Sequence, residues 1–151
     1  MSRRDQIRMS DEEVARFLEE QRVVVCATNG PDGFPHLMPL WYVVRDGRIW
    51  AWTYAKSQKV KNLERDRRAT LQIETGVEYA ELRGMMLRCD VTIHRDVEVV
   101  TEFAMEVVDR YMSGGEDARD GFRKQAPKRV ALEFVERDRV TWDHRKLGGT
   151  Y

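Results

Sequence analysis

A cluster of basic and hydroxyl side chains, Thr53-Tyr54-Ala55-Lys56-Ser57-Gln58-Lys59, lies where an apolar segment ends and a polar helical pattern begins. The first amides of a helix carry partial positive charge, so two lysines and two hydroxyls beside them could bind an anion such as phosphate. Spacing alone favours the simpler interpretation, in which Ser57 caps an ordinary helix and the lysines are solvated. The chain has no Gly-x-x-x-x-Gly-Lys or Gly-x-Gly-x-x-Gly motif, which argues against a P-loop protein and a Rossmann dehydrogenase.

A proline interrupts the apolar segment Leu37-Met38-Pro39-Leu40-Trp41-Tyr42. Because proline has no N–H to donate, this strand must lie at a sheet edge or contain a bulge. The edge could simply tolerate Pro39, or the unpaired backbone near Leu40 and Trp41 could hydrogen-bond a planar ligand. The four tryptophans are typical of a core or an interface, but some could wall a ring-binding cleft. They are Trp41, Trp50, Trp52 and Trp142.

The sequence gives little evidence for other kinds of reactive site. The three histidines, His36, His94 and His144, lack metal-ligand spacing, so we expect no metal site. No Gly-x-Ser-x-Gly or Cys–His arrangement indicates a covalent nucleophile. A bound cofactor is therefore the more economical source of activity. Cys26 and Cys89 fall in apparent strands, and we expect them to be buried thiols rather than a disulfide.

The composition limits the possible partners. A chain of 151 residues is the size of one domain, and its 26 basic and 26 acidic residues balance. No net field would therefore draw it to nucleic acid or an acidic membrane. The N-terminus has no apolar targeting segment, and no run is long enough to span a bilayer, so we expect a cytoplasmic protein.

Periodicity predicts a mainly β chain with peripheral helices. Ser10 and Glu13 form a capping box before a helix over residues 10–20, and a second long helix follows at 97–113. A short helix is expected at 59–66 and a loop at 116–127. Six strands are predicted, the first three as a meander, with Gly84 as a bend or bulge and residues 140–142 extending the last strand. They cover 23–28, 37–44, 49–54, 69–75, 79–94 and 130–134. This pattern indicates a six-stranded antiparallel barrel, closed or partly split.

Three motifs follow one another in the first half of the chain. They are Asp32-Gly33-x-Pro35-His36-x-x-Pro39-x-Trp41, Asp46-Gly47-x-Ile49 and Thr53-x-x-Lys56-Ser57-x-Lys59-x-x-Asn62-Leu63-x-x-Asp66-x-Arg68-Ala69. Their order resembles that of the pyridoxamine 5'-phosphate oxidase-like split barrels. Within them it is most similar to the flavin/deazaflavin oxidoreductase group, which uses coenzyme F420. The resemblance covers roughly residues 23–93, and the ending 142–151 is also similar.

The resemblance implies a homodimer of split barrels with two cofactor sites at the subunit interface. The cofactor phosphate would bind the helix-opening cluster, the ring would lie along the proline-containing strand, and His36 would lie near the ring edge. Tyr79 and Trp142 would approach from the partner subunit. The cofactor-binding residues implied are His36, Pro39, Leu40, Trp41, Thr53, Lys56, Ser57, Lys59, Asn62, Tyr79 and Trp142.

The reaction implied is hydride transfer from reduced F420 to an unsaturated or quinone-like small molecule, with His36 as the candidate proton donor. FMN is the rival cofactor, because it also presents a tricyclic ring and a phosphate. A carrier or sensor that binds the cofactor without turning it over is the non-enzymatic alternative. Vitamin B6 oxidation is disfavoured, because the chain lacks the basic C-terminal cluster of true pyridoxamine phosphate oxidases.

Overall fold

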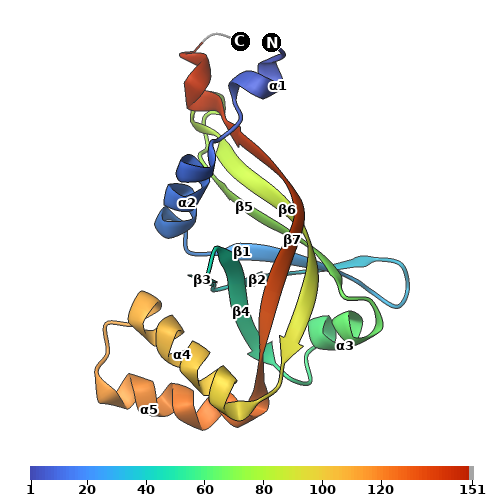
Figure 1. Cartoon of the computed structure of the whole chain (residues 1–151), viewed down its shortest axis with the longest axis vertical. Coiled ribbons are helices and arrows are strands. Elements are labelled where there is room, and N and C mark those ends of the chain that lie inside the picture. The colour runs from blue at the N-terminus through green and yellow to red at the C-terminus, as the bar shows by residue number, and fades with distance from the viewer. Residues whose placement is uncertain (150–151) are drawn as a thin grey trace.

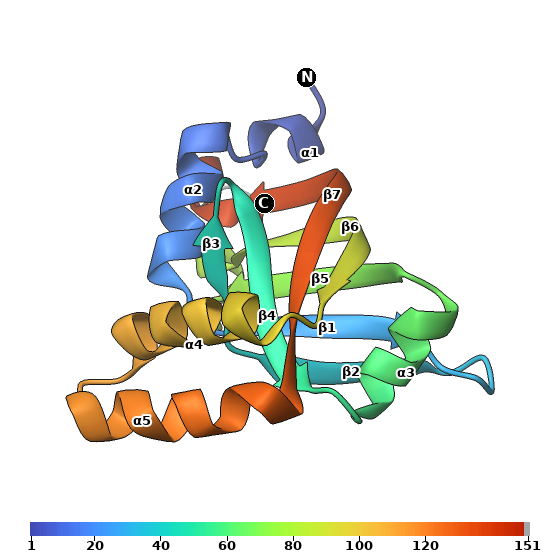
Figure 2. The same ribbon diagram turned by 60° about the horizontal axis from the view of Figure 1, so that its bottom comes forward.

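Seven antiparallel strands form one strongly curled sheet in the computed structural model, which describes residues 1–149 (Figures 1 and 2). The strand order is β2-β1-β5-β6-β7-β4-β3. The strands are β1 (Val24–Asn29), β2 (Pro35–Leu40), β3 (Val43–Arg45), β4 (Arg48–Tyr54), β5 (Arg68–Thr75), β6 (Arg83–His94) and β7 (Arg129–Asp143). The helices are α1 (Arg3–Gln6), α2 (Asp11–Glu20), α3 (Gln58–Arg65), α4 (Val97–Tyr111) and α5 (Glu116–Gln125). The mainly β, split-barrel class is confirmed.

The predicted strand over 37–44 is two strands, and this division raises the count from six to seven. β2 pairs with β1 and β3 pairs with β4, so both antiparallel pairings of the predicted meander form. The meander is not continuous, because β2 and β3 lie at opposite edges of the sheet. The chain crosses between them at Tyr42, whose side chain is fully buried. The Tyr42 hydroxyl lies 2.6 Å from the Leu18 carbonyl oxygen and 3.0 Å from that of Gln21, at the end of α2. Pro39 does lie on an edge strand, as its missing N–H predicts.

The core fills the concave side of the sheet, and α2 packs across it (Figure 1). The strand predicted over 79–94 buries every second residue, since Met85, Leu87, Cys89 and Val91 are all buried. That strand begins only at Arg83, because residues Tyr79–Glu81 form a 3-10 turn. Its register shift lies between Arg88 and Cys89 rather than at Gly84. The last strand is continuous through residues 140–142, as predicted.

The segment predicted as a loop at 116–127 is mostly helix α5, so that prediction is wrong. No residue of α5 is completely buried, so its sequence lacks the periodic apolar residues that would have indicated a helix. It is supported by charge pairs, in which Arg123 contacts both Glu116 and Asp120. Its one aromatic ring, Phe122, stacks on Trp52 of β4 at 5.2 Å. Figure 2 shows α4 and α5 side by side next to β4.

Two smaller predictions can also be compared with the structure. Cys26 and Cys89 are buried free thiols, as expected. Among residues 1–149, no helix has both the length and the apolar character needed to cross a membrane. Thr150 and Tyr151, the end of the tail used in the resemblance, lie outside the described residues.

Candidate functional site

The helix-opening cluster contains a buried lysine. Lys59 is only 8% exposed, and its ammonium donates a 3.0 Å hydrogen bond to the hydroxyl of Thr53. None of the ion pairs among residues 1–149 involves Lys59. Burial lowers the pKa of its ammonium, and the positive charge of Arg129 lowers it further. A buried cation without a neighbouring carboxylate favours the binding of an anion.

The start of α3 adds donors to this position. Ser57 is the N-cap residue, but its hydroxyl makes no capping hydrogen bond to the helix. It lies 3.4 Å from the Thr53 hydroxyl, while Lys56 is exposed. Hydrogen bonds thus bring Thr53, Ser57 and Lys59 together. We call the four predicted residues Thr53, Lys56, Ser57 and Lys59 the anion socket, and their binding of a phosphate stays a prediction. Ser57 is not the ordinary side-chain cap of the simpler interpretation, because its hydroxyl accepts a hydrogen bond from Thr53 instead of capping the helix. Its O–H can still donate to a ligand.

Asn62 lies one turn further along α3 and is fully buried. Its side-chain amide donates a 3.0 Å hydrogen bond to Thr28 of β1 and accepts one of 2.9 Å from Gln58. These bonds use the amide to fix α3 against the sheet. Asn62 thus positions the socket in this structure.

A cleft of about 400 Å³ lies beside the end of β2. Three predicted residues line it, namely Pro39, Leu40 and Trp41. Trp41 is 42% exposed, and one face of its ring stacks on Tyr111 of α4 at 4.5 Å and 7°. The remaining lining side chains are Trp52 from β4, Phe122 and Gln125 from α5, and Arg129 from β7. Such an aromatic-walled cleft is suited to a planar ring.

Arg129 is the principal residue that the sequence did not reveal. Its guanidinium lies 3.6 Å from the ring centre of Tyr54 and 4.6 Å from that of Trp52. Arg129 Nη2 donates to the Gln125 side-chain oxygen at 2.7 Å, whereas Nε is buried without a hydrogen-bond partner in the described part of the chain. Burial lowers the pKa of this guanidinium. The signal that could have identified it was a basic residue opening the apolar strand Val130–Phe134.

His36 lies on β2 opposite Thr28. Strand alternation places it on the same face of β2 as Leu40, although it does not line the cleft itself. Its Nδ1 atom is buried and has no hydrogen-bond partner among residues 1–149. Its contact with a ligand and its proton-donor role stay predictions.

Tyr79 and Trp142 are remote from the cleft within one chain. Trp142 lies near the far end of β7, whose 15 residues begin at Arg129 and would span roughly 45 Å when extended. There the Trp142 ring packs so closely on Gly84 that a Cβ at residue 84 would come within 2.4 Å of it. Tyr79 is 55% exposed and packs edge-on against His144 at 4.6 Å. Neither residue can complete the site of its own subunit.

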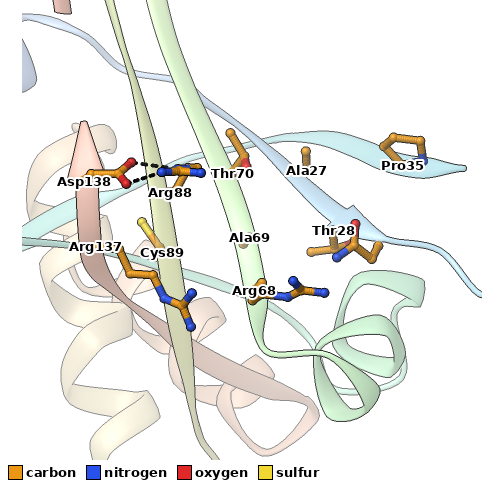
Figure 3. A pocket seen from close by; sticks show the side chains of 11 residues that line it. Ala27, Thr28, Pro35, Arg68, Ala69, Thr70, Arg88, Cys89, Arg137 and Asp138 are labelled. Carbon is orange, nitrogen blue, oxygen red and sulfur yellow. Dashed lines mark hydrogen bonds and ion pairs between the residues drawn. The ribbon is translucent and has the colours of Figure 1, made fainter. Parts of the chain in front are cut away.

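A larger cavity of about 630 Å³ lies on the outer face of β1, β5, β6 and β7 (Figure 3). Its arginines are already paired, unlike Lys59. Arg88 Nε donates to Asp138 at 2.8 Å, and Arg137 Nη2 donates to Asp90 at 2.7 Å. This neutralised face is therefore a poor anion site.

Known proteins share this architecture. The family model described as pyridoxamine 5'-phosphate oxidase matches residues 10–141. A conserved hypothetical protein from Mycobacterium tuberculosis is 38% identical, with a TM-score of 0.91 over 100% of this chain and 95% of that one. No curated protein gives a significant match.

Two more distant structures are an F420 reductase and a heme storage protein from Vibrio cholerae. The reductase is 19% identical, with a TM-score of 0.64 over 82% of this chain and 93% of that one. The heme storage protein is 14% identical, with a TM-score of 0.68 over 85% and 90%. At these identities only the fold is shared. The match to the family model over most of the length, together with the 38% identical relative, shows that this chain belongs to the pyridoxamine 5'-phosphate oxidase family.

Proposed function

We propose that this protein is an oxidoreductase that binds the deazaflavin coenzyme F420 and supports hydride transfer to an unsaturated or quinone-like small molecule. The observation that carries the proposal is Lys59, a buried ammonium with no acidic partner among residues 1–149. A phosphate would supply the missing negative charge and accept hydrogen bonds from the socket. One protein of the same fold is an F420 reductase, which is consistent with this choice of cofactor.

The residues present fit such a group. The anion socket offers the Lys59 ammonium, the Ser57 hydroxyl and the first amides of α3 to a phosphate. The cleft offers the edge backbone of Pro39 and Leu40, and the free part of the Trp41 ring, to a flat ring system. The deazaflavin supplies hydride-transfer chemistry when bound.

The protein's own contribution would be to bind, orient and exclude water. The Trp41–Tyr111 stack fixes a flat apolar surface, so a ring placed against it would be held in one plane. Trp52 and Phe122 would keep water from the reacting face. In this proposal His36 donates a proton to the substrate from its imidazole.

A homodimer forms part of the proposal. The β1–β2 edge region exposes several large apolar side chains, which are Val23, Val25, Leu37, Met38 and Trp41. Side chains of this size gathered at one sheet edge favour contact with another polypeptide. A second copy would cover this edge and could deliver Tyr79 and Trp142 to the cleft.

Titration of the purified protein with F420 and with FMN, followed by fluorescence, tests the proposal. We expect tighter binding of F420 and oxidation of its reduced form when a quinone is added. Tighter binding of FMN would identify the rival cofactor, and binding without turnover would indicate a carrier or sensor. If neither cofactor bound, the proposal would be wrong.

A further inference from the structure

Arg129 lies in the ring cleft rather than among the four residues of the anion socket. The cleft of about 400 Å³ is lined by Arg129 but by none of those four residues. A negative charge bound at Arg129 would therefore belong to a molecule lying in the cleft. The charge-binding position at Arg129 is therefore distinct from the phosphate position at Lys59, although the two cations are close enough to affect each other.

The guanidinium is held in place before any ligand arrives. Tyr54 and Trp52 contact it at 3.6 and 4.6 Å from their ring centres, and Gln125 accepts a hydrogen bond from Nη2 at 2.7 Å. A cation fixed in this way loses little conformational freedom on binding an oxyanion. Aromatic faces and a neutral amide do not neutralise its charge.

Two features show that Arg129 does not have all the interaction partners that its guanidinium can take. No ion pair among residues 1–149 includes Arg129, and its Nε is buried with no hydrogen-bond partner there. By contrast, Arg88 and Arg137 on the same sheet each have a bidentate aspartate. A negatively charged oxygen placed in the cleft would supply the counter-charge that the described part of the protein does not give this guanidinium.

We propose that Arg129 binds the oxyanion of a planar aromatic substrate, with the ring of that substrate lying on the Trp52–Phe122 side of the cleft and facing the cofactor ring at Trp41. The group is a carboxylate or a comparable oxyanion attached directly to a conjugated ring. Gln125 is a positioning residue that holds the guanidinium toward the cleft. The inference rests on the proposed function for its claim that this molecule is the substrate.

The test compares naphthoate with naphthamide, which have the same flat ring system but differ in charge. Tryptophan fluorescence and calorimetry give the two dissociation constants without any cofactor. We expect the wild-type protein to prefer naphthoate by about tenfold or more. Arg129→Gln should remove that preference, and Arg129→Lys should retain only part of it because the planar fork is lost.

Lys128→Gln is the matched control, because it removes the same charge from the exposed neighbouring residue. It should leave the preference for naphthoate unchanged. Equal affinity for the two probes in the wild-type protein, or a preference that survives in Arg129→Gln, would overturn the inference.

A cofactor titration of the same variants separates the two proposals. Arg129→Gln should change the F420 dissociation constant by less than about threefold, because Arg129 does not line the anion socket. A loss of F420 affinity as large as that of Lys59→Met would assign Arg129 to the cofactor phosphate and overturn the inference. Absence of F420 binding to the wild-type protein would instead count against the proposed function, while the naphthoate preference would still be measurable.

Discussion

Lys59 is a buried cation whose placement opposes stability and favours ligand binding. Moving an ammonium out of water costs free energy, and the single hydrogen bond to Thr53 offsets only part of that cost. Residues arranged in this way commonly belong to binding sites, where the ligand supplies the missing interaction.

Lys59→Met should therefore stabilise the protein and weaken binding. Methionine keeps the volume and removes the charge, so we expect the free energy of unfolding to rise by about 1 kcal/mol at neutral pH. F420 affinity should fall by about tenfold or more. Urea unfolding and the cofactor titration measure the two effects. Lys61→Met, on the exposed side of the same helix, should change each quantity little.

The stability difference between Lys59→Met and the wild-type protein should depend on pH, because the pKa of Lys59 is lowered in the folded protein. The folded protein releases this proton at a lower pH than the unfolded chain, whose lysine titrates near 10.5. Below the folded pKa the full cost of the buried charge is present, and stability rises as the pH passes from there toward 10.5. The advantage of the methionine variant should shrink over that range. An advantage that stayed constant would contradict this account.

The two thiols should be chemically inert in the folded protein. Burial raises the pKa of Cys26 and that of Cys89 to about 12, and the thiolate is the reactive form. We expect iodoacetamide to modify neither residue in native protein at mildly alkaline pH, and both in urea, as measured by mass spectrometry. Between the usual value of 9.0 and about 12, the unfolded chain loses these protons first, so stability should fall as pH rises. Rapid native modification would show that the strands open.

At the scale of elements, α4 holds the chain crossing that separates β2 from β3. The Tyr111 hydroxyl accepts a 3.0 Å hydrogen bond from the Tyr42 amide and lies 2.7 Å from the Tyr42 carbonyl oxygen. The Tyr111 ring supports Trp41, and Arg110 donates to the carbonyls of Leu18 and Gln21 at the end of α2. The ring surface of the cleft is thus positioned by a helix distant in sequence.

Tyr111→Phe should separate the contribution of the Tyr111 hydroxyl, which bonds Tyr42, from that of the ring, which supports Trp41. The variant keeps the ring under Trp41 but leaves the Tyr42 amide without its partner, so we expect stability to fall by about 1 kcal/mol in urea unfolding. Tyr111→Leu should also remove the aromatic stack and alter tryptophan fluorescence, which Tyr111→Phe should leave nearly unchanged. Wild-type stability in Tyr111→Phe would show that water replaces the hydroxyl.

At the scale of the whole molecule, one subunit does not bring all the predicted residues together. Tyr79 and Trp142 lie near the end of the long strands opposite Arg129. In the proposed homodimer, a second copy docks on the exposed apolar edge at β1 and β2, which continues from the cleft at Trp41.

Leu37→Glu should therefore dissociate the proposed homodimer. Leu37 is 57% exposed, so a glutamate there is tolerated in the monomer but would be buried unpaired at the interface. We expect light scattering to show monomers, circular dichroism to stay unchanged, and F420 affinity to fall. Val97→Glu, at a half-exposed position on α4, should remain dimeric. A wild-type protein that is monomeric would refute the homodimer.

Local patterns in the sequence were enough to predict many elements. The capping box at Ser10 and Glu13 forms as expected, and strict alternation correctly assigned the buried face of β6. Pro39 indicated an edge strand because a missing N–H has the same consequence in any sheet. The helix α5 was missed because charge pairs, rather than a buried apolar face, support it.

The anion cluster at Thr53 to Lys59 was visible as a short stretch of sequence, because its members lie close together along the chain. Only the tertiary structure decided which of them is buried, and that Asn62 is bonded to Thr28. It also brought Arg129 beside Tyr54 through pairing of β4 with β7. Such neighbours depend on strand order and register, which are fixed by packing between distant segments and leave no short-range pattern in the sequence.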